Sequence, residues 1–462
     1  MPKPPVSNSG VRSQPSSRER LAGDDGWGHR AGDRVVETSV RQVARCSSMI
    51  VRARVVLPIC RPPIDDGAVR ISRTRIGAVG RWRDFSAGKR EPVVDLGQCV
   101  LLPGLINAHC HLDCTTLARR LPAHKGFVGW IQALLAARAG LSHADYVESW
   151  LRGARMLVRT GTTMVANIEA VPDVLPGVWE ATPLRVISFI EMTGVKSQLS
   201  PSAILQEASR IIASLPRGRH GAGLSPHAPY STRPEVLQLG AQAARCHRWL
   251  LTTHVAESAV EFDLFAHKRG ALADWLQTQR DLSDCGHGSP VWFLEKLGVL
   301  GPRLLAVHVN YLGNGDARRL GRKRVSVVHC PRSHAYFRHR QFPHQALSSA
   351  GVNLCLGTDS LASVRCRRGE TLELSMFAEM RALAAHSPDL SPEVILRMAT
   401  LNGARALHRQ GELGELRAGA RADLIAVPFA GKRHAACEAV VRHSGAVAAS
   451  MIDGRWALEP RL

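Results

Sequence analysis

The chain has 462 residues, of which 45% are hydrophobic and 5% aromatic, and a formal net charge of +21. This length suffices for a large domain and a smaller one, and the absence of a secretory signal or of a roughly 20-residue apolar span predicts a cytoplasmic protein without a membrane partner. The excess charge is mostly arginine scattered along the chain, so we expect solvated surfaces and no nucleic-acid partner.

The first segment, residues 1–48, is rich in Ser, Arg, Gly and Pro and shows no sustained period. Such a composition is typical of a disordered extension. Regular patterning begins just after Met49, which raises the hypothesis that translation starts there.

Short strand-like runs separated by turn signals fill residues 50–100, and the same pattern occurs again near the C-terminus. The strand-like segments are IVRARVVLP, GAVRISRTRIGAVG, PVVDLGQCV, ADLIAVP and GAVAASMIDGRWAL. Two all-β flanks around a long middle predict one small β domain built from both ends of the chain. We expect it to comprise residues 49–100 and 411–462, with a second domain over 101–410.

Eight buried-strand candidates, separated by helical patterns, run through the middle of the chain. Eight β-then-α units are typical of a (β/α)8 barrel, whose active site lies at the C-terminal strand ends. The sequence therefore predicts an α/β fold, a TIM-type barrel with a small flanking β-sandwich. The runs are VLLPGLIN (100–107), TTMVANI (162–168), LRVISFIE (184–191), GAGLSP (221–226), LLTTH (250–254), LLAVH (304–308), VSVVHC (325–330) and VNLCLGTD (352–359).

The first run leads into His109 and His111, separated by one residue. Alternate residues of a strand point to the same face, so the two imidazoles can leave the strand end together, as a chelating pair requires. Two histidines also fall at this spacing by chance, so the pair alone does not decide between the two interpretations. The neighbouring Cys110 and Cys114 are expected to be reduced structural thiols, since the 11 cysteines form no C-x-x-C units.

Polar residues end or closely follow five of the eight runs. If the barrel prediction is right, all five positions converge on one mouth, and a shared metal site explains them better than scattered structural histidines. The positions are His109 with His111, His227, His254, His308 and Asp359.

At these positions the chain resembles the amidohydrolase superfamily, in its branch of metal-dependent deaminases and chlorohydrolases. The segments that carry the resemblance are PGLINAHCHLD, GLSPHAPYS, TTHVAES, the His308 strand end and LGTDS. The resemblance covers roughly residues 50–460 and implies that His109, His111, His254 and Asp359 bind one divalent metal ion. Three imidazoles and a carboxylate suit zinc, with iron as the alternative.

The resemblance also assigns catalytic roles. Glu257, in HVAE, is expected to carry the proton to the ring nitrogen and then to the leaving amine, since a desolvated carboxyl can have a raised pKa. His308 and Asp359 would orient the attacking water, with Asp359 also taking its proton. Some relatives carry a carboxylated lysine after the fourth strand, where this chain has His227, so we expect a mononuclear site.

The substrate expected from the resemblance is an adenine nucleoside with a substituted 5′ end, such as S-adenosylhomocysteine, methylthioadenosine or aminodeoxyfutalosine. His227 would contact it. Two departures bear on this: C-P-R-S-H at 330–334 replaces the usual N-P-x-S-N, and Ser363 is followed by Val364 without the usual asparagine.

Four further side chains are candidates for the pocket. Arg332 and His334 could meet a substrate carboxylate or the purine edge, or lie solvated in their loop. Phe127 and Trp130 could cover the substrate, although packing in a helix core is the favoured interpretation.

Other functions stay open. Guanine or cytosine deamination, chlorotriazine hydrolysis or cyclic amide opening would use the same scaffold, and a catalytically inactive barrel could bind nucleic acid through its basic surface. A zinc cytidine-deaminase fold is disfavoured, because its H-x-E with P-C-x-x-C signature is absent. The sequence leaves open whether the protein is a homo-oligomer.

Overall fold

The structure is a computed structural model that describes residues 48–88, 91–122, 126–195, 197–216, 218–365 and 372–460. The predicted extension therefore lies outside the described residues, apart from Ser48. None of the helices in the described ranges combines the length and the apolar character that a membrane crossing requires.

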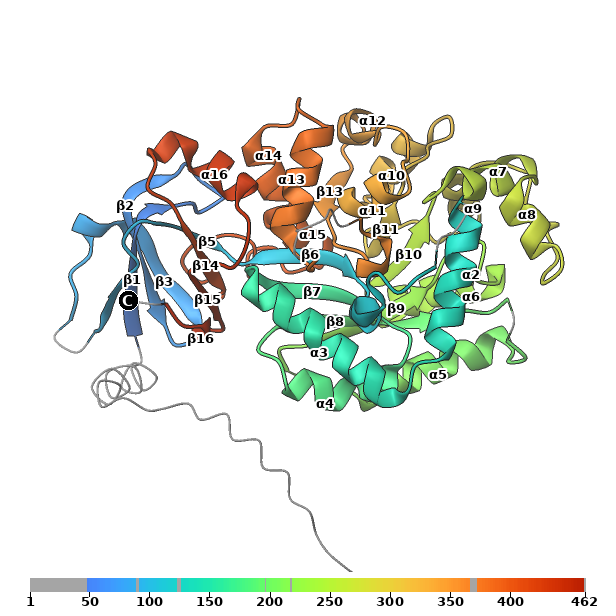
Figure 1. Cartoon of the computed structure of the whole chain (residues 1–462), viewed down its shortest axis with the longest axis horizontal. Helices are drawn as coiled ribbons and strands as arrows, with labels where there is room; N and C mark the ends of the chain where they lie inside the picture. Colours follow the sequence, from blue (N-terminus) through green and yellow to red (C-terminus); the bar gives the residue numbers. More distant parts are fainter. Residues whose placement is uncertain are drawn as a thin grey trace, which may run out of the picture. The chain divides into compact units, whose positions relative to one another are not determined.

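Eight parallel strands form the barrel (Figure 1), hydrogen-bonded in the order β13-β12-β11-β10-β9-β8-β7-β6. An isolated parallel bridge joins Cys110 to Asp359, and the backbone N–H groups of Thr358 and Asp359 both donate to the His109 carbonyl, which ties the last strand end to the first. The barrel prediction is confirmed. The strands are β6 (Leu105–Cys110), β7 (Thr162–Glu169), β8 (Arg185–Met192), β9 (Gly221–Pro226), β10 (Leu251–Val255), β11 (Leu304–His308), β12 (Ser326–His329) and β13 (Asn353–Leu356).

The first predicted run, residues 100–107, is two strands and not one. Residues up to Pro103 belong to β5 (Cys99–Pro103) of the flanking sheet, and the barrel strand begins at Leu105. The chain changes sheets at Gly104, where an added Cβ would lie 2.0 Å from the Thr163 hydroxyl oxygen. A continuous apolar run conceals this change, because the strand is buried in both sheets.

The barrel strands bury both of their faces. On β8, Ile187 and Phe189 pack in the inner cluster, whereas Val186 and Ile190 belong to the outer cluster beneath the helices. This alternation follows from the two-residue period of a strand. Because both faces are apolar, these strands read as continuous hydrophobic runs in the sequence.

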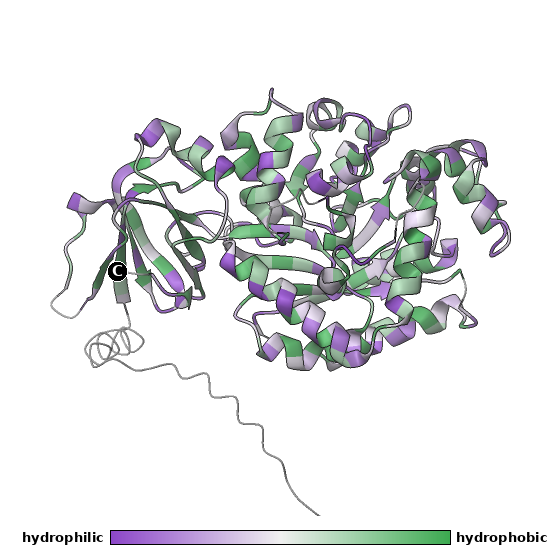
Figure 2. Cartoon of the chain, in the orientation of Figure 1, coloured by the Kyte–Doolittle hydropathy of each residue, from purple (hydrophilic) through white to green (hydrophobic). Residues whose placement is uncertain are grey.

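Helices cover the barrel, with polar residues on their outer surfaces (Figure 2). Local signals set their starts: the Ser142 hydroxyl and the Asp145 carboxylate form a capping box at the start of α3, and α5, α6, α9 and α14 begin with proline. The helices are α2 (Gly126–Ala139), α3 (His143–Arg159), α4 (Leu175–Glu180), α5 (Pro201–Ser214), α6 (Pro234–Cys246), α7 (Ala259–His267), α8 (Ala271–Leu276), α9 (Pro290–Lys296), α10 (Asp316–Arg322), α11 (Pro331–Tyr336), α12 (His344–Ser349), α13 (Met376–His386), α14 (Pro392–Met398), α15 (Leu401–Ala406) and α16 (Ala436–Arg442). The short 3₁₀ helices of the described residues are η1 (Trp82–Asp84), η2 (Leu112–Leu117), η3 (Pro172–Val174), η4 (Leu361–Ser363) and η5 (Arg433–Ala435).

A second sheet combines strands from both ends of the described chain, in the order β16-β15-β14-β5-β1-β2-β3, with β4 beside β1. This mixed sheet confirms the predicted flanking β domain; the predicted domain boundaries stay a prediction. The remaining strands are β1 (Ser48–Val56), β2 (Ile64–Ser72), β3 (Arg75–Arg81), β4 (Val93–Asp95), β14 (Leu424–Pro428), β15 (Ala449–Ile452) and β16 (Arg455–Leu458).

A buried ion pair joins this sheet to the barrel. Nε and Nη2 of Arg185, the first residue of β8, donate to the two carboxylate oxygens of Asp423 at 2.6 and 3.1 Å. Asp453 makes a further ion pair with the same guanidinium. The N-terminal end of β8 is thus held to the flanking sheet by paired charges.

Candidate metal and catalytic centre

The C-terminal strand ends bring together the predicted ligands. His109 lies on β6 and His111 directly follows it, His254 lies on β10, His308 ends β11, and Asp359 follows β13. All five side chains therefore reach the same mouth of the barrel, as parallel strands require.

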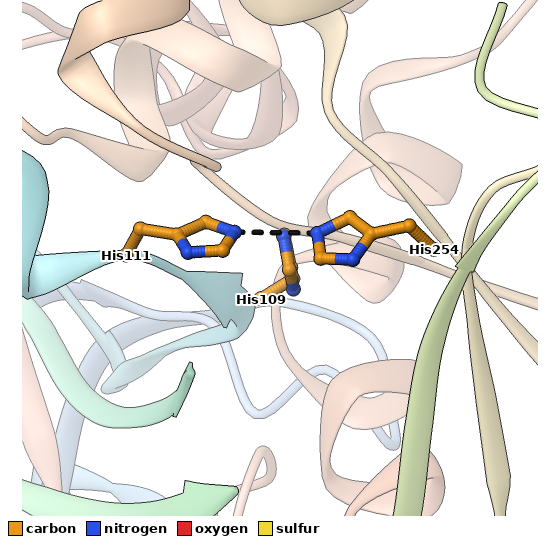
Figure 3. A group of neighbouring side chains, drawn as sticks. All are labelled: His109, His111 and His254. Carbon is orange, nitrogen blue, oxygen red and sulfur yellow. Dashed lines mark hydrogen bonds between the residues drawn. The ribbon is translucent and has the colours of Figure 1, made fainter. Parts of the chain in front are cut away.

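Three imidazoles converge at this mouth (Figure 3). Nε2 of His111 lies 3.2 Å from Nε2 of His254, and one ring nitrogen of each of His109, His111 and His254 lies within 4.8 Å of the others. His109 is fully buried, and neither of its ring nitrogens has a hydrogen-bond partner among the described residues. Buried polar atoms rarely stay unpaired, so this arrangement fits a bound cation.

Asp359 adds a carboxylate to the group. Its Oδ1 lies 3.5 Å from Nε2 of His109 and 3.6 Å from Nε2 of His111. His109, His308 and Asp359 form a second set of close ligand atoms. Imidazoles and a carboxylate at one point are the donor set that zinc and similar divalent ions prefer.

The site keeps these side chains in metal-binding protonation states. Burial holds the pKa values of His111, His254 and His308 well below the usual range. Burial by itself would raise the pKa of Asp359, but the neighbouring imidazoles, His109 foremost, lower it well below its usual value. Neutral imidazoles and an ionised carboxylate are the forms that bind metal.

Neighbouring groups orient two of these side chains. Nδ1 of His254 lies 2.8 Å from the carbonyl oxygen of His227, to which it can donate, leaving Nε2 with its lone pair toward the centre. The Ser363 hydroxyl donates to Oδ2 of Asp359 at 3.1 Å. Such outer hydrogen bonds fix ring tautomer and ligand direction.

Four described positions at the mouth have left-handed backbone conformations without being glycine. Ala256, His308, Val309 and Asp359 have φ values of 51°, 73°, 51° and 54°. Conformations of this kind cost about 1–3 kcal/mol each and persist where the surrounding structure enforces them. Here they turn the chain sharply at strand ends that carry the functional side chains.

Glu257 lies beside this group, three residues after His254. Its Oε1 is 3.6 Å from Nε2 of His308, and burial raises its pKa well above the usual value, with Asp359 and Glu261 adding to the shift. The Glu261 carboxylate accepts from the backbone N–H groups of Ala256 and Glu257, at 2.9 and 2.8 Å, which anchors the turn. A carboxyl with a raised pKa in this position can hold a proton and release it to a bound molecule.

A cavity of about 240 Å³ opens onto the centre. His227 lines it, and Nδ1 of this residue lies 2.6 Å from the Ser231 hydroxyl. Burial, with the nearby charge of Arg138, lowers the pKa of His227 to about 4. The imidazole is therefore neutral and can exchange hydrogen bonds with a bound molecule.

Arg332 and His334, predicted as substrate contacts, are not among the lining residues of this cavity in the described ranges. Nη1 of Arg332 donates to the Glu373 carbonyl at 2.9 Å, and its backbone N–H donates to Glu379. His334 is buried, with Nδ1 at 3.0 Å from Oδ1 of Asn310, whose amide donates to the Glu257 carbonyl. Both residues lie on helix α11, which follows β12, and their side chains take part in packing and hydrogen bonding of the protein itself.

Phe127 and Trp130 have separate positions. Trp130 lines the cavity, and its indole N–H donates to the Ala362 carbonyl at 3.3 Å. Phe127 is not among the described lining residues and packs against the rings of Trp130, Tyr230 and Phe337. Core packing therefore describes Phe127, whereas Trp130 also forms part of the cavity wall.

Sequence reasoning missed two charged side chains of the cavity wall, Arg138 of α2 and Glu191 of β8. Glu191 ends the third apolar run, so it carried the strand-end signal that identified the histidines. Arg138 carried no such signal, because its position depends on how α2 packs. Cys114 also lines the cavity, and it and Cys110 are buried free thiols, in agreement with the expectation.

Comparisons with known proteins agree with this geometry. The model of the amidohydrolase family matches residues 100–457. The 5-methylthioadenosine/S-adenosylhomocysteine deaminase of Syntrophobacter fumaroxidans is 32% identical over 384 residues, which cover 79% of this chain and 80% of that protein. The 5′-deoxyadenosine deaminase of Methanothermobacter thermautotrophicus is 29% identical, with 74% of this chain and 76% of that protein covered.

Among solved structures, an adenosine deaminase from Xanthomonas campestris with bound zinc superposes with a TM-score of 0.77. It is 26% identical to this chain, and the match covers 89% of this chain and 93% of that one. The similarity therefore spans the barrel and the flanking sheet together.

Proposed function

The chain belongs to the amidohydrolase family, and on that premise we propose that it is a metal-dependent deaminase of adenine nucleosides with a substituted 5′ carbon. The observation that carries the proposal is the convergence of His109, His111, His254 and Asp359 beside Glu257 at the mouth of the barrel. Relatives named for deamination of 5-methylthioadenosine, S-adenosylhomocysteine and 5′-deoxyadenosine support the substrate class.

We assign one zinc ion to the cluster, held by His109, His111, His254 and Asp359. The partnerless ring nitrogens of His109 and the 3.2 Å approach of His111 to His254 support this ligand set. When bound, such an ion lowers the pKa of water and supplies hydroxide near neutral pH. His227 takes the place where a bridging lysine would be needed for two ions, which supports a single one.

The remaining side chains handle protons and orientation. Glu257 gives a proton to the ring nitrogen beside the amine-bearing carbon, takes up the proton of the added hydroxyl group and gives it to the departing amine, which leaves as ammonia. Its burial and raised pKa support this role. His308 and Asp359 orient the attacking water, and Asp359 accepts a proton from it. His227, which lines the cavity beside His254, contacts the substrate.

A substrate screen tests the proposal. Metal-reconstituted protein is incubated with 5′-deoxyadenosine, 5′-methylthioadenosine and S-adenosylhomocysteine, and in parallel with guanine, cytosine and a chlorotriazine, while ammonia or chloride release is measured. We expect ammonia from the adenosines. Turnover confined to a free base or a triazine, or salt-sensitive nucleic-acid binding without any turnover, would contradict the proposed function.

A further inference from the structure

Two charged side chains outside the catalytic group line the cavity, and they differ in their ion-pair partners. Nη2 of Arg138 lies 3.2 Å from Oδ2 of Asp113, which is buried and is not a lining residue in the described ranges. Arg138 is thus paired from behind by a carboxylate. Glu191 lines the cavity itself, and its charge also acts on Arg138.

No other lysine or arginine lines the cavity in the described part of the chain. Among the described lining residues the one cation, Arg138, already has Asp113 as its partner, so a negative charge on Glu191 is only partly compensated. A second anion placed in this cavity would therefore meet like charge in a desolvated setting, where Coulomb repulsion is stronger than in water.

Helices α2 and α8 contribute an apolar part of the cavity wall. An amphipathic helix directs its apolar side chains to the core, but α2 also carries apolar residues on its cavity side, and Leu135 is 49% exposed. Such a surface suits an uncharged, apolar group of a ligand. The residues of this apolar wall are Trp130, Ile131, Leu134, Leu135, Trp275 and Leu276.

Strand order separates this region from the reacting end. Glu257 follows β10 and His308 ends β11. Glu191 lies near the end of β8, which is two strands from β10 and three from β11. We place the amine-bearing ring beside Glu257, and the same cavity reaches from there to Glu191 and the apolar wall.

We propose that Glu191 is a specificity-determining residue that makes this enzyme select adenine nucleosides with an uncharged, apolar 5′ substituent, such as a thioether, over those with a carboxylate. The inference rests on the proposed deaminase function. Asp113 and Arg138 are positioning residues. The carboxylate of Asp113 pairs with the guanidinium of Arg138, which would otherwise bind a substrate carboxylate.

The test uses a matched pair of substrates, adenosine 5′-carboxamide and adenosine 5′-carboxylate, which have similar shape and differ in charge. With wild-type protein, kcat/KM for ammonia release should favour the carboxamide by roughly tenfold or more. The Glu191→Gln variant should narrow this preference to less than about threefold, because the carboxylate gains while the carboxamide keeps its rate.

The Glu207→Gln variant is the matched control, since Glu207 is exposed on α5 and pairs with Arg210 at the surface. It loses the same charge and should keep the wild-type preference. Equal use of both substrates by wild-type protein, or an unchanged preference in Glu191→Gln, would overturn the assignment of Glu191. Failure of the reconstituted enzyme to release ammonia from any adenosine would instead overturn the proposed function and this inference with it.

Discussion

The two ends of strand β8 carry opposite charges in different surroundings. Arg185 begins the strand and forms a bidentate pair with Asp423. Glu191, six residues later, lies beside the catalytic cavity. The inward-facing Ile187 and Phe189 separate the two ends by roughly 20 Å at the usual rise of a strand.

The two ends of the barrel thus serve different purposes, stability at one and binding and catalysis at the other. At the N-terminal end, buried charges are paired and join two sheets. At the C-terminal end, burial leaves the pKa of Glu257 raised and the ring nitrogens of His109 without partners in the described residues. Unbalanced groups of this kind are costly to stability and useful for binding and catalysis, so changes at the two ends should affect different measurements.

Metal removal should have the largest effect on the C-terminal end. Chelation is expected to reduce ammonia release to background, because His109, His111 and Asp359 then have no ion to hold. Adding zinc should restore activity at about one equivalent per chain. Metal analysis that finds two equivalents in active enzyme would contradict the single-ion proposal.

The Glu257→Gln substitution should have the next largest effect on activity. It keeps the size of the side chain and removes its ability to carry a proton, so kcat should fall by about 10²- to 10⁴-fold while KM changes little. Zinc content serves as the control and should match wild type. A kcat within a few-fold of wild type would remove Glu257 from the mechanism.

The Arg185→Met substitution tests the other end. It leaves Asp423 buried without its cation, so we expect the free energy of unfolding to fall by about 3–5 kcal/mol, measured by urea unfolding. Folded variant protein should keep the wild-type kcat. The exposed Arg210→Met change, which breaks a surface pair with Glu207, should leave the midpoint of unfolding unchanged.

The smallest expected effect concerns Glu169, at the end of β7. Burial raises its pKa to about 8, although the Ser188 hydroxyl donates to it at 2.6 Å. The unfolded carboxyl ionises near pH 4.5, so its stabilising contribution is complete below that pH and is lost as the pH rises to about 8.

Glu169→Gln should therefore match wild-type stability near about pH 4.5 and exceed it above about pH 8, by an amount on the order of 1 to 3 kcal/mol. Unfolding curves at the two pH values measure the difference. Equal stabilities at high pH would show that Glu169 is ionised in the folded protein at little cost.

The sequence was sufficient where the signal is periodic or local. Eight apolar runs predicted the barrel because its strands are buried on both faces, and the polar residues at their ends predicted which side chains meet. The short strand-like runs at the two flanks predicted a β domain built from both ends of the chain. The same patterns could not reveal that the run at 100–107 changes sheets at Gly104, since both halves are buried.

Tertiary packing decided which other side chains line the cavity. Arg332 and His334 follow a strand as His111 and His227 do, yet Glu373, Glu379 and Asn310 draw them away from the cavity. Arg138 lies on a helix, where no strand-end rule applies, and reaches the cavity only because α2 packs over it. The sequence by itself predicted the fold and the side chains that meet at the mouth of the barrel, because strand period and strand ends are local properties. The charge and shape of the substrate cavity depend on contacts between distant segments, and only the tertiary structure decided them.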